Sequence, residues 1–158
     1  MESDLRKKLE RGIERFLRKS SLKYSIDKDG DYHLILGFEE FPAQVRVFIL
    51  REGLQGEILS IIARYEGIER PIGEQEALSL ANRWNQEHRW PRVYWKEGYF
   101  YADFHLDVEC GISQKLLELT LHRLLMGIVR FLLYLVKGED LLSQELRKWL
   151  LGYYPRLN

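Results

Sequence analysis

Three residues on one predicted strand are of types that can bind a metal ion. Asp103, His105 and Asp107 are spaced two residues apart, so in an extended strand their side chains point to the same face. Carboxylate oxygens and imidazole nitrogens are ordinary zinc ligands. This spacing allows a metal-dependent enzyme or sensor as an alternative function. A solvated strand face carries the same residue types and is the simpler interpretation, so we predict no metal ligand and no cofactor.

The single cysteine is a second place to look for chemistry. Cys110 lies just before a predicted helix start, where a helix N-terminus can stabilise a thiolate. A small residue that fills a strand-to-helix corner explains this position more simply. The sequence places no nucleophile beside a base, and three histidines, His33, His88 and His122, stand far apart without an evident partner. We therefore predict no catalytic residue and no enzymatic activity.

Aromatic and basic residues alternate on the hairpin predicted around the turn at 97–98. Such residues resemble a platform on which single-stranded nucleic acid stacks. Acidic residues in the same hairpin weaken the attraction for phosphates, and the whole chain balances 24 basic against 24 acidic residues. We therefore predict no nucleic-acid partner. The residues in question are Arg92, Tyr94, Lys96, Tyr99 and Tyr101.

Hydrophobic periodicity predicts the elements that position these residues. Apolar residues at three- and four-residue steps indicate helices over 3–20, 74–87, 112–137 and, in the tail, 141–151. Alternating apolar residues indicate strands over 23–27, 32–38, 44–51, 57–65, 93–96 and 100–108. The chain lacks the regular strand–helix alternation of a doubly wound fold. We therefore predict an α+β domain: a helix, a four-strand antiparallel meander, a helix, a two-strand hairpin, and a long helix packed on the sheet, with a short tail helix.

The length of 158 residues favours one domain, which we assign to 1–138, with 139–158 as a tail packed on it or at a dimer interface. One cysteine cannot form an internal disulfide, and the N-terminal segment lacks the apolar core of a signal peptide. The most apolar window, 124–136, contains Arg130 and is shorter than the roughly 20 residues that cross a bilayer. We predict a cytoplasmic protein without membrane insertion.

The long helix carries two apolar stripes. The first is the stripe that a helix lays on a sheet, and it consists of Leu117, Leu121, Leu124, Ile128, Phe131, Leu132 and Leu135. The second occurs only in the C-terminal half of the helix and consists of Met126, Val129, Leu133 and Val136. The third side of the helix carries charged residues at seven-residue steps, Arg123, Arg130 and Lys137. We expect this side to be solvated or paired with opposite charges.

The apolar side chains of the second stripe need another apolar surface to cover them. Leaving such side chains in water forfeits about 1.5 to 3 kcal/mol each. A second subunit, a helix of a client protein, or the tail could cover them, since the tail has an apolar stripe of its own at Leu142, Leu146, Trp149, Leu150 and Tyr153. Self-cover and homodimerisation both remain open. The predicted partner or dimer surface comprises Met126, Val129, Leu133, Val136, Leu146 and Trp149.

Residues 77–132 resemble a known protein family. The residues that carry the resemblance are Ala81, Asn82 and Asn85 on a helix, a strand ending in Val108, and Gly111-Ile112-Ser113 before the long helix. This segment resembles the YbjN-domain family, bacterial proteins labelled sensory transduction regulators. The tail from 141 to 158 extends beyond the family's usual end.

The resemblance implies a fold similar to type III secretion chaperones, small dimeric α+β proteins that bind extended or amphipathic segments of other proteins. It implies no established enzymatic activity. The leading hypothesis is therefore a non-enzymatic protein-binding module, chaperone-like or a regulatory adaptor. The alternatives are the metal-dependent enzyme or sensor above and a purely structural homodimer subunit.

Overall fold

The computed structural model describes residues 4–137 of the chain. Its helices are α1 (Asp4–Lys19), α2 (Glu74–Glu87) and α3 (Gln114–Lys137). Its strands are β1 (Ser25–Ile26), β2 (Tyr32–Gly37), β3 (Gln44–Glu52), β4 (Ile58–Glu66), β5 (Arg92–Lys96) and β6 (Tyr99–Asp107). The predicted α+β class and the predicted order of elements up to the long helix are confirmed.

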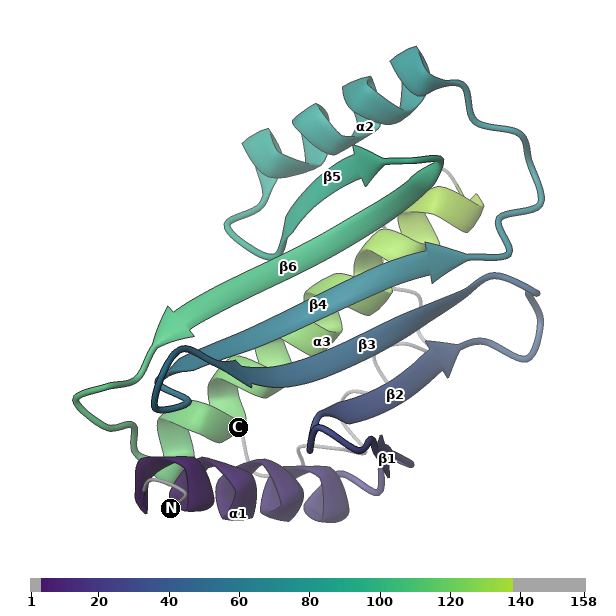
Figure 1. Ribbon diagram of the computed structural model, residues 1–158. Helices are drawn as coiled ribbons and strands as arrows, with labels where there is room; N and C mark the ends of the chain where they lie inside the picture. Colours follow the sequence, from purple (N-terminus) through teal and green to yellow (C-terminus); the bar gives the residue numbers. More distant parts are fainter. Residues whose placement is uncertain (1–3, 138–158) are drawn as a thin grey trace.

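The strands form one antiparallel sheet in the order β1-β2-β3-β4-β6-β5 (Figure 1). The meander from β1 to β4 and the hairpin of β5 and β6 join because β6 pairs with β4, with Ile61 opposite Phe104. This pairing brings together segments that are about 40 residues apart in the chain. The α2 helix, inserted between them, lies beside β5 at the end of the sheet.

One face of the sheet is covered and the other is open. In Figure 1, α3 runs behind the sheet and α1 crosses below it, while none of the described helices lies over the front face. The covered face is apolar because alternate strand residues, such as Val47, Ile61 and Ala102, point to it and are buried. Tyr65 ties the two layers together, since its hydroxyl donates to the Ile128 carbonyl at 2.7 Å.

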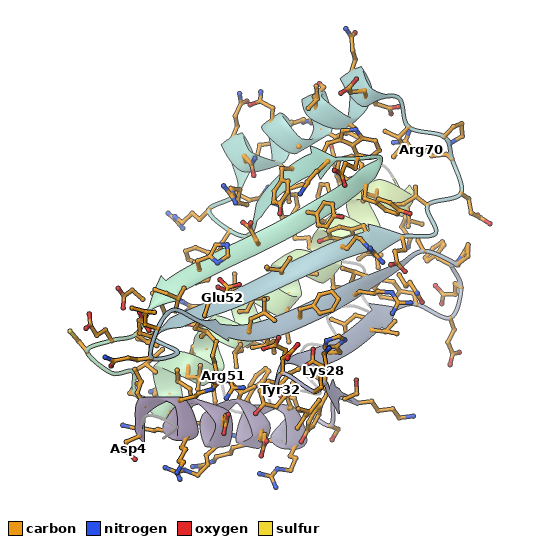
Figure 2. The ribbon with its side chains drawn as sticks, viewed as in Figure 1. Asp4, Lys28, Tyr32, Arg51, Glu52 and Arg70 are labelled. Atoms are coloured by element: carbon orange, nitrogen blue, oxygen red, sulfur yellow. The ribbon has the colours of Figure 1, made fainter. Side chains whose placement is uncertain are left out.

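Polar contacts and a close approach attach α1. Arg51 of β3 is buried and donates to Glu10 of α1 and, at 2.6 Å, to the Gly30 carbonyl. Figure 2 shows Arg51 between the sheet and α1. A Cβ at Gly12 would lie 2.6 Å from Leu117 Cδ2, so the missing side chain lets α1 cross close to α3. Gln114 fixes the crossing by donating to the Gly12 carbonyl at 3.1 Å.

Two elements begin two residues later than the sequence predicted, and the other described boundaries agree within one residue. The β1 strand is limited to Ser25–Ile26, which is shorter than predicted. The long helix begins at Gln114 and not at 112, because Gly111 has a φ of 93° and Ser113 caps the helix by accepting from Leu116 N at 3.1 Å. The tail helix predicted over 141–151 lies outside the described residues, and so does Gly138, which follows α3 in the sequence.

Among the described residues, α3 is the one helix long and apolar enough to cross a membrane by length and composition. Its most apolar window has a mean hydropathy of 1.6, and 56% of that window is buried inside the fold. A core helix passes the same test, so the observation is weak evidence for a span. The residues predicted for the first stripe, from Leu117 to Leu135, are all buried as core.

Candidate functional site

The edge of the sheet at β5 is closed by a side chain. Asn85 of α2 donates its amide to the Val93 carbonyl at 2.9 Å and accepts from Val93 N at 3.0 Å. These two bonds take the place of a neighbouring strand. Asn85 is one of the residues that carry the family resemblance, and its position on α2 sets α2 along β5.

The opposite edge, at β2, is open over most of its length. The β1 strand pairs with only two β2 residues, Tyr32 and His33. No described strand pairs with Leu34–Gly37 on this side. Alternate residues of a strand direct their N–H and C=O groups to each side, so this stretch presents backbone donors and acceptors outward.

A groove lies beside the open edge. It has a volume of about 850 Å³, and its walls come from the segment after α1, from β2 with the turn that follows, and from α3. The lining combines apolar and charged side chains, including Leu22, Lys23, Ile35, Phe38, Glu39 and Val129. Ile35 is 56% exposed, so the groove adjoins an apolar side chain in contact with water. We call this groove with Leu34–Gly37 the β2 site.

The residues of the second stripe of α3 lie in different surroundings and do not form one surface. Val129 and Leu133 are buried, with exposures of 4% and 2%, and Val129 lines the β2 site. Met126 and Val136 are partly buried against the core and line two other depressions. The tail residues predicted to join them, Leu146 and Trp149, lie outside the described residues. The six-residue partner surface and the tail domain assignment therefore stay predictions.

The strand face considered for a metal ion as an alternative, Asp103, His105 and Asp107, does not converge on an ion site. Asp103 is only 5% exposed, and Arg92, directly opposite in the register, donates to it at 2.8 and 2.6 Å. Asp107 instead accepts from Glu109 N at 2.9 Å. Among the described residues, no group of three or more histidine, cysteine or acidic side chains could hold a metal ion. The expectation of a solvated face is wrong at Asp103, because Arg92 covers it.

Hydrogen bonds hold Asp103 in its charged form. Burial raises the pKa of this carboxyl, but the hydrogen bonds and charge of Arg92, with a further contribution from His105, outweigh burial and keep the pKa below its usual value. The salt bridge also joins β5 to β6, so it fixes the outermost strand of the sheet.

A serine that the sequence analysis did not single out completes a polar network. Ser60 of β4 lies opposite His105, donates to Glu52 at 3.0 Å, and lies 2.7 Å from His105 Nδ1. The other ring nitrogen, Nε2, is 3.5 Å from Asp103. A serine, a histidine and an aspartate therefore meet, but Ser60 is fully buried and its proton goes to Glu52. Without access to a substrate, the serine cannot act as a nucleophile in this arrangement.

The tyrosine rings considered as a nucleic-acid platform pack against one another and against arginine side chains. Tyr94 and Tyr101 stack with centroids 5.5 Å apart, and the Arg92 guanidinium lies 5.2 Å from the Tyr94 ring centroid. Arg64 lies over Tyr99 at 5.3 Å in the same way. These contacts occupy at least one face of each ring, which reduces the surface on which a base could stack.

The other residues considered for chemistry make contacts that stabilise the fold or lie in a turn. His33 Nε2 lies 3.0 Å from Asp27, and the His88 ring stacks on Trp84 at 3.6 Å, so both have the partners that the sequence did not reveal. Cys110 is exposed in the turn before α3. Trp90, in the loop before β5, is 36% exposed. The buried Trp84 holds this loop against the core by donating to the Pro91 carbonyl at 3.1 Å.

The fold and its sites define a class: an α+β domain with one open sheet edge. In its described part no group of three or more histidine, cysteine or acidic side chains could hold a metal ion, and Ser60, beside His105, is buried. A family model matches residues 11–135, and the chain belongs to that family, YbjN, described as "Putative bacterial sensory transduction regulator". This match confirms the resemblance predicted from residues 77–132. The family description names a regulator and no reaction. A search of curated proteins found no match.

Proposed function

We propose that this protein is a non-enzymatic, cytoplasmic regulatory module that binds an extended segment of another protein at the β2 site. The observation that carries the proposal is the unpaired stretch Leu34–Gly37 beside a groove of about 850 Å³. An extended segment that pairs with a sheet edge gains backbone hydrogen bonds, and its side chains gain affinity from neighbouring pockets. The family's description as a regulator supports the same function.

The groove favours apolar side chains in the bound segment. A strand added beside β2 would point alternate side chains to the two faces of the sheet. On the covered side these side chains would meet Leu22, Phe38 and Val129, whereas on the open side they would meet Ile35. Burial of each large apolar side chain contributes about 1.5 to 3 kcal/mol.

Charged residues around the groove favour one orientation of the bound segment. Lys23 comes from the segment after α1, and Glu39 and Glu40 come from the turn after β2, and all three are exposed. A segment with an acidic residue near Lys23 and a basic residue near the glutamates would match this pattern. Such rim charges act mainly on association rate and specificity.

A second copy of the chain is the alternative occupant. Two β2 edges can pair antiparallel about a twofold axis, which would produce a homodimer through the sheet edge and not through the α3 surface predicted from the sequence. Light scattering at increasing concentration distinguishes the two occupants. Dimerisation that disappears in an edge variant would support self-pairing, and a monomer that binds a partner through the same edge would support the regulatory module.

The test uses two exposed apolar residues. In Ile35→Lys a charge is placed on the open edge, which opposes strand addition. Leu78→Lys on α2 is the matched control, because Leu78 is 52% exposed and Ile35 is 56% exposed. Affinity capture from a bacterial lysate with quantitative mass spectrometry should identify proteins that are retained by the wild type and by Leu78→Lys and lost by Ile35→Lys.

Hydrogen exchange then locates the contact. With a captured partner bound, those amides of residues 34–37 that point away from β3 should exchange at least ten-fold more slowly than in the free protein, because a new strand protects them. If partners bind equally to both lysine variants, or if protection lies elsewhere, the β2 site is not the binding surface.

A further inference from the structure

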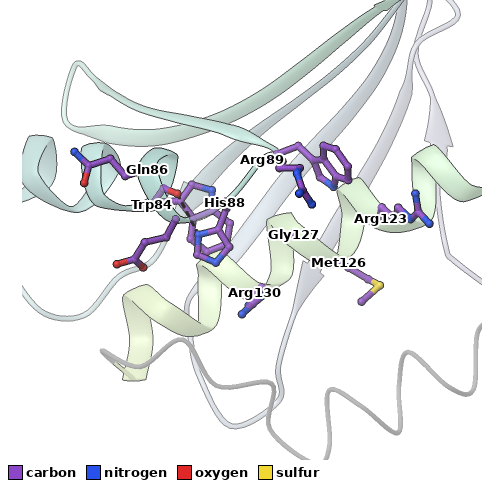
Figure 3. Close-up of a pocket in the computed structure, with 10 residues that line it drawn as sticks. Trp84, Gln86, His88, Arg89, Arg123, Met126, Gly127 and Arg130 are labelled. Atoms are coloured by element: carbon purple, nitrogen blue, oxygen red, sulfur yellow. Dashed lines mark hydrogen bonds between the residues drawn. The ribbon is translucent and has the colours of Figure 1, made fainter.

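A second, chemically different cavity lies between the end of α2 and the middle of α3. Its volume is about 560 Å³, within the usual size of a small-molecule site. Figure 3 shows Arg123, Gly127 and Arg130 along α3, with Arg89 facing them from the loop that follows α2. We call this cavity the arginine pocket. It is lined by residues from two segments that are far apart in the sequence, 84–90 and 123–130.

A glycine allows the loop to lie on the helix. A Cβ at Gly127 would lie 2.7 Å from Pro91 Cδ and 3.2 Å from the Trp90 carbonyl oxygen, so a side chain there would push the loop away. Gly127 lies between two arginines, Arg123 and Arg130, that are seven residues, or about two turns, apart on the same side of α3. The floor of the pocket is therefore backbone with a guanidinium at each end.

The wall formed by the α2 end is rigidly placed. The rings of His88 and Trp84 stack at 3.6 Å with planes 12° apart. His88 Nδ1 donates to the Trp84 carbonyl at 3.1 Å, and the Trp84 indole donates to the Pro91 carbonyl at 3.1 Å. Such a wall is preorganised, so a ligand would not have to order it on binding.

The pocket is positively charged. Its lining has three arginines and one acidic residue, Glu87, which is already paired with Arg83 at 3.0 Å. Arg89 and Arg123 are exposed and make no ion pair with another described residue. Burial, with a smaller contribution from Arg123, lowers the pKa of the neighbouring His122 to about 4, so this histidine is neutral at pH 7.

We propose that the arginine pocket binds a small phosphate monoester that carries a planar ring, with the dimensions of a mononucleotide. Arginine forks bind phosphate oxygens in pairs, and Arg89 and Arg123, from two different segments, line this cavity. Trp90, 36% exposed, and the Met126 thioether supply the apolar and aromatic surface for the ring. This site goes beyond the β2 site, since a small ligand here would make the module responsive to a metabolite.

Titration calorimetry with three probes separates the two parts of the proposed ligand. Adenosine monophosphate serves as the ring-bearing phosphate, inorganic phosphate as the anion alone, and adenosine as the ring alone. The monophosphate should bind at least ten-fold more tightly than either fragment, and its affinity should fall with added salt. No binding of the monophosphate at millimolar concentration, or equal affinity for it and inorganic phosphate, would overturn the proposal.

Matched variants locate the binding. Arg89→Gln and Arg123→Gln together should weaken monophosphate binding at least ten-fold, because both residues are exposed and their removal leaves the core intact. Arg15→Gln, an exposed arginine of α1, should bind as the wild type does. Trp90→Leu should weaken the monophosphate and leave the weak binding of inorganic phosphate unchanged. Unaltered monophosphate affinity in the double variant would show that the pocket is not the site.

Discussion

The two edges of the sheet differ, since the edge at β5 is closed and the edge at β2 is open. At β5, Asn85 satisfies the outward backbone groups of Val93, and the Arg92–Asp103 salt bridge fixes this strand to β6. At β2, the stretch Leu34–Gly37 has no strand beside it among the described residues. An open edge is a risk for aggregation, so proteins usually close it. A chain that closes one edge with a dedicated side chain and leaves the other bare beside a groove has the arrangement expected of a binding edge.

Removal of the Asp103 side chain should have the largest effect on the closed edge. Asp103→Ala leaves Arg92 without its acceptor and opens a buried position, which should lower the free energy of unfolding by about 2 kcal/mol. Urea denaturation at pH 7 measures the change. The matched control is Asp107→Ala, at an exposed position of the same strand, with an expected change within about 0.5 kcal/mol. Equal changes in both variants would show that the salt bridge does not hold β5.

Opening the closed edge should have the next largest effect. Asn85→Ala leaves Val93 N and its carbonyl without partners, and should cost about 1 kcal/mol because the site is partly solvated. The variant should also self-associate, because β5 then resembles the open β2 edge. Denaturation and light scattering test both effects. Asn82→Ala, on an exposed position of α2, should change neither, and a monomeric Asn85→Ala would mean that α2 alone shields the edge.

The sequence predicted the local elements of this contrast but not the contacts that create it. Hydrophobic periodicity placed α2 to the residue and most strands within two residues, because each depends on neighbours along the chain. The pairing of β4 with β6 is a long-range contact, so the meeting of Ser60 with His105 left no local signal. Asp103 was expected to be solvated for the same reason, since its cover comes from another strand.

The arginine pocket was likewise only partly predictable from the sequence. The seven-residue spacing of Arg123 and Arg130 was visible in the sequence, but nothing connected these arginines with the loop that follows α2. Their juxtaposition depends on Gly127, whose missing side chain lets the loop approach α3, and a glycine inside an apolar helix gives no indication of its neighbour. The β2 site was anticipated only through Val129, because an open edge is a property of the whole sheet.

Acid should weaken the closed edge selectively, and this is the smallest expected effect. The folded-state pKa of Asp103 is lower than the ordinary value of 3.8, because the hydrogen bonds and charge of Arg92, with a contribution from His105, outweigh burial. The unfolded chain therefore takes up a proton at this residue at a higher pH than the folded protein does. The stabilisation is fully present above pH 3.8 and decreases as pH falls toward the folded-state pKa.

Urea denaturation between about pH 5 and pH 3 tests this sign against the ordinary value of 3.8. The wild type should lose stability more steeply with falling pH than Asp103→Asn, which cannot take up this proton. Asp107→Asn should keep the wild-type slope, because Asp107 is exposed and lies outside the salt bridge. Parallel curves for the wild type and Asp103→Asn would mean that the charge of Asp103 does not stabilise the closed edge, and that Asn85 and the packing of α2 are sufficient to close it.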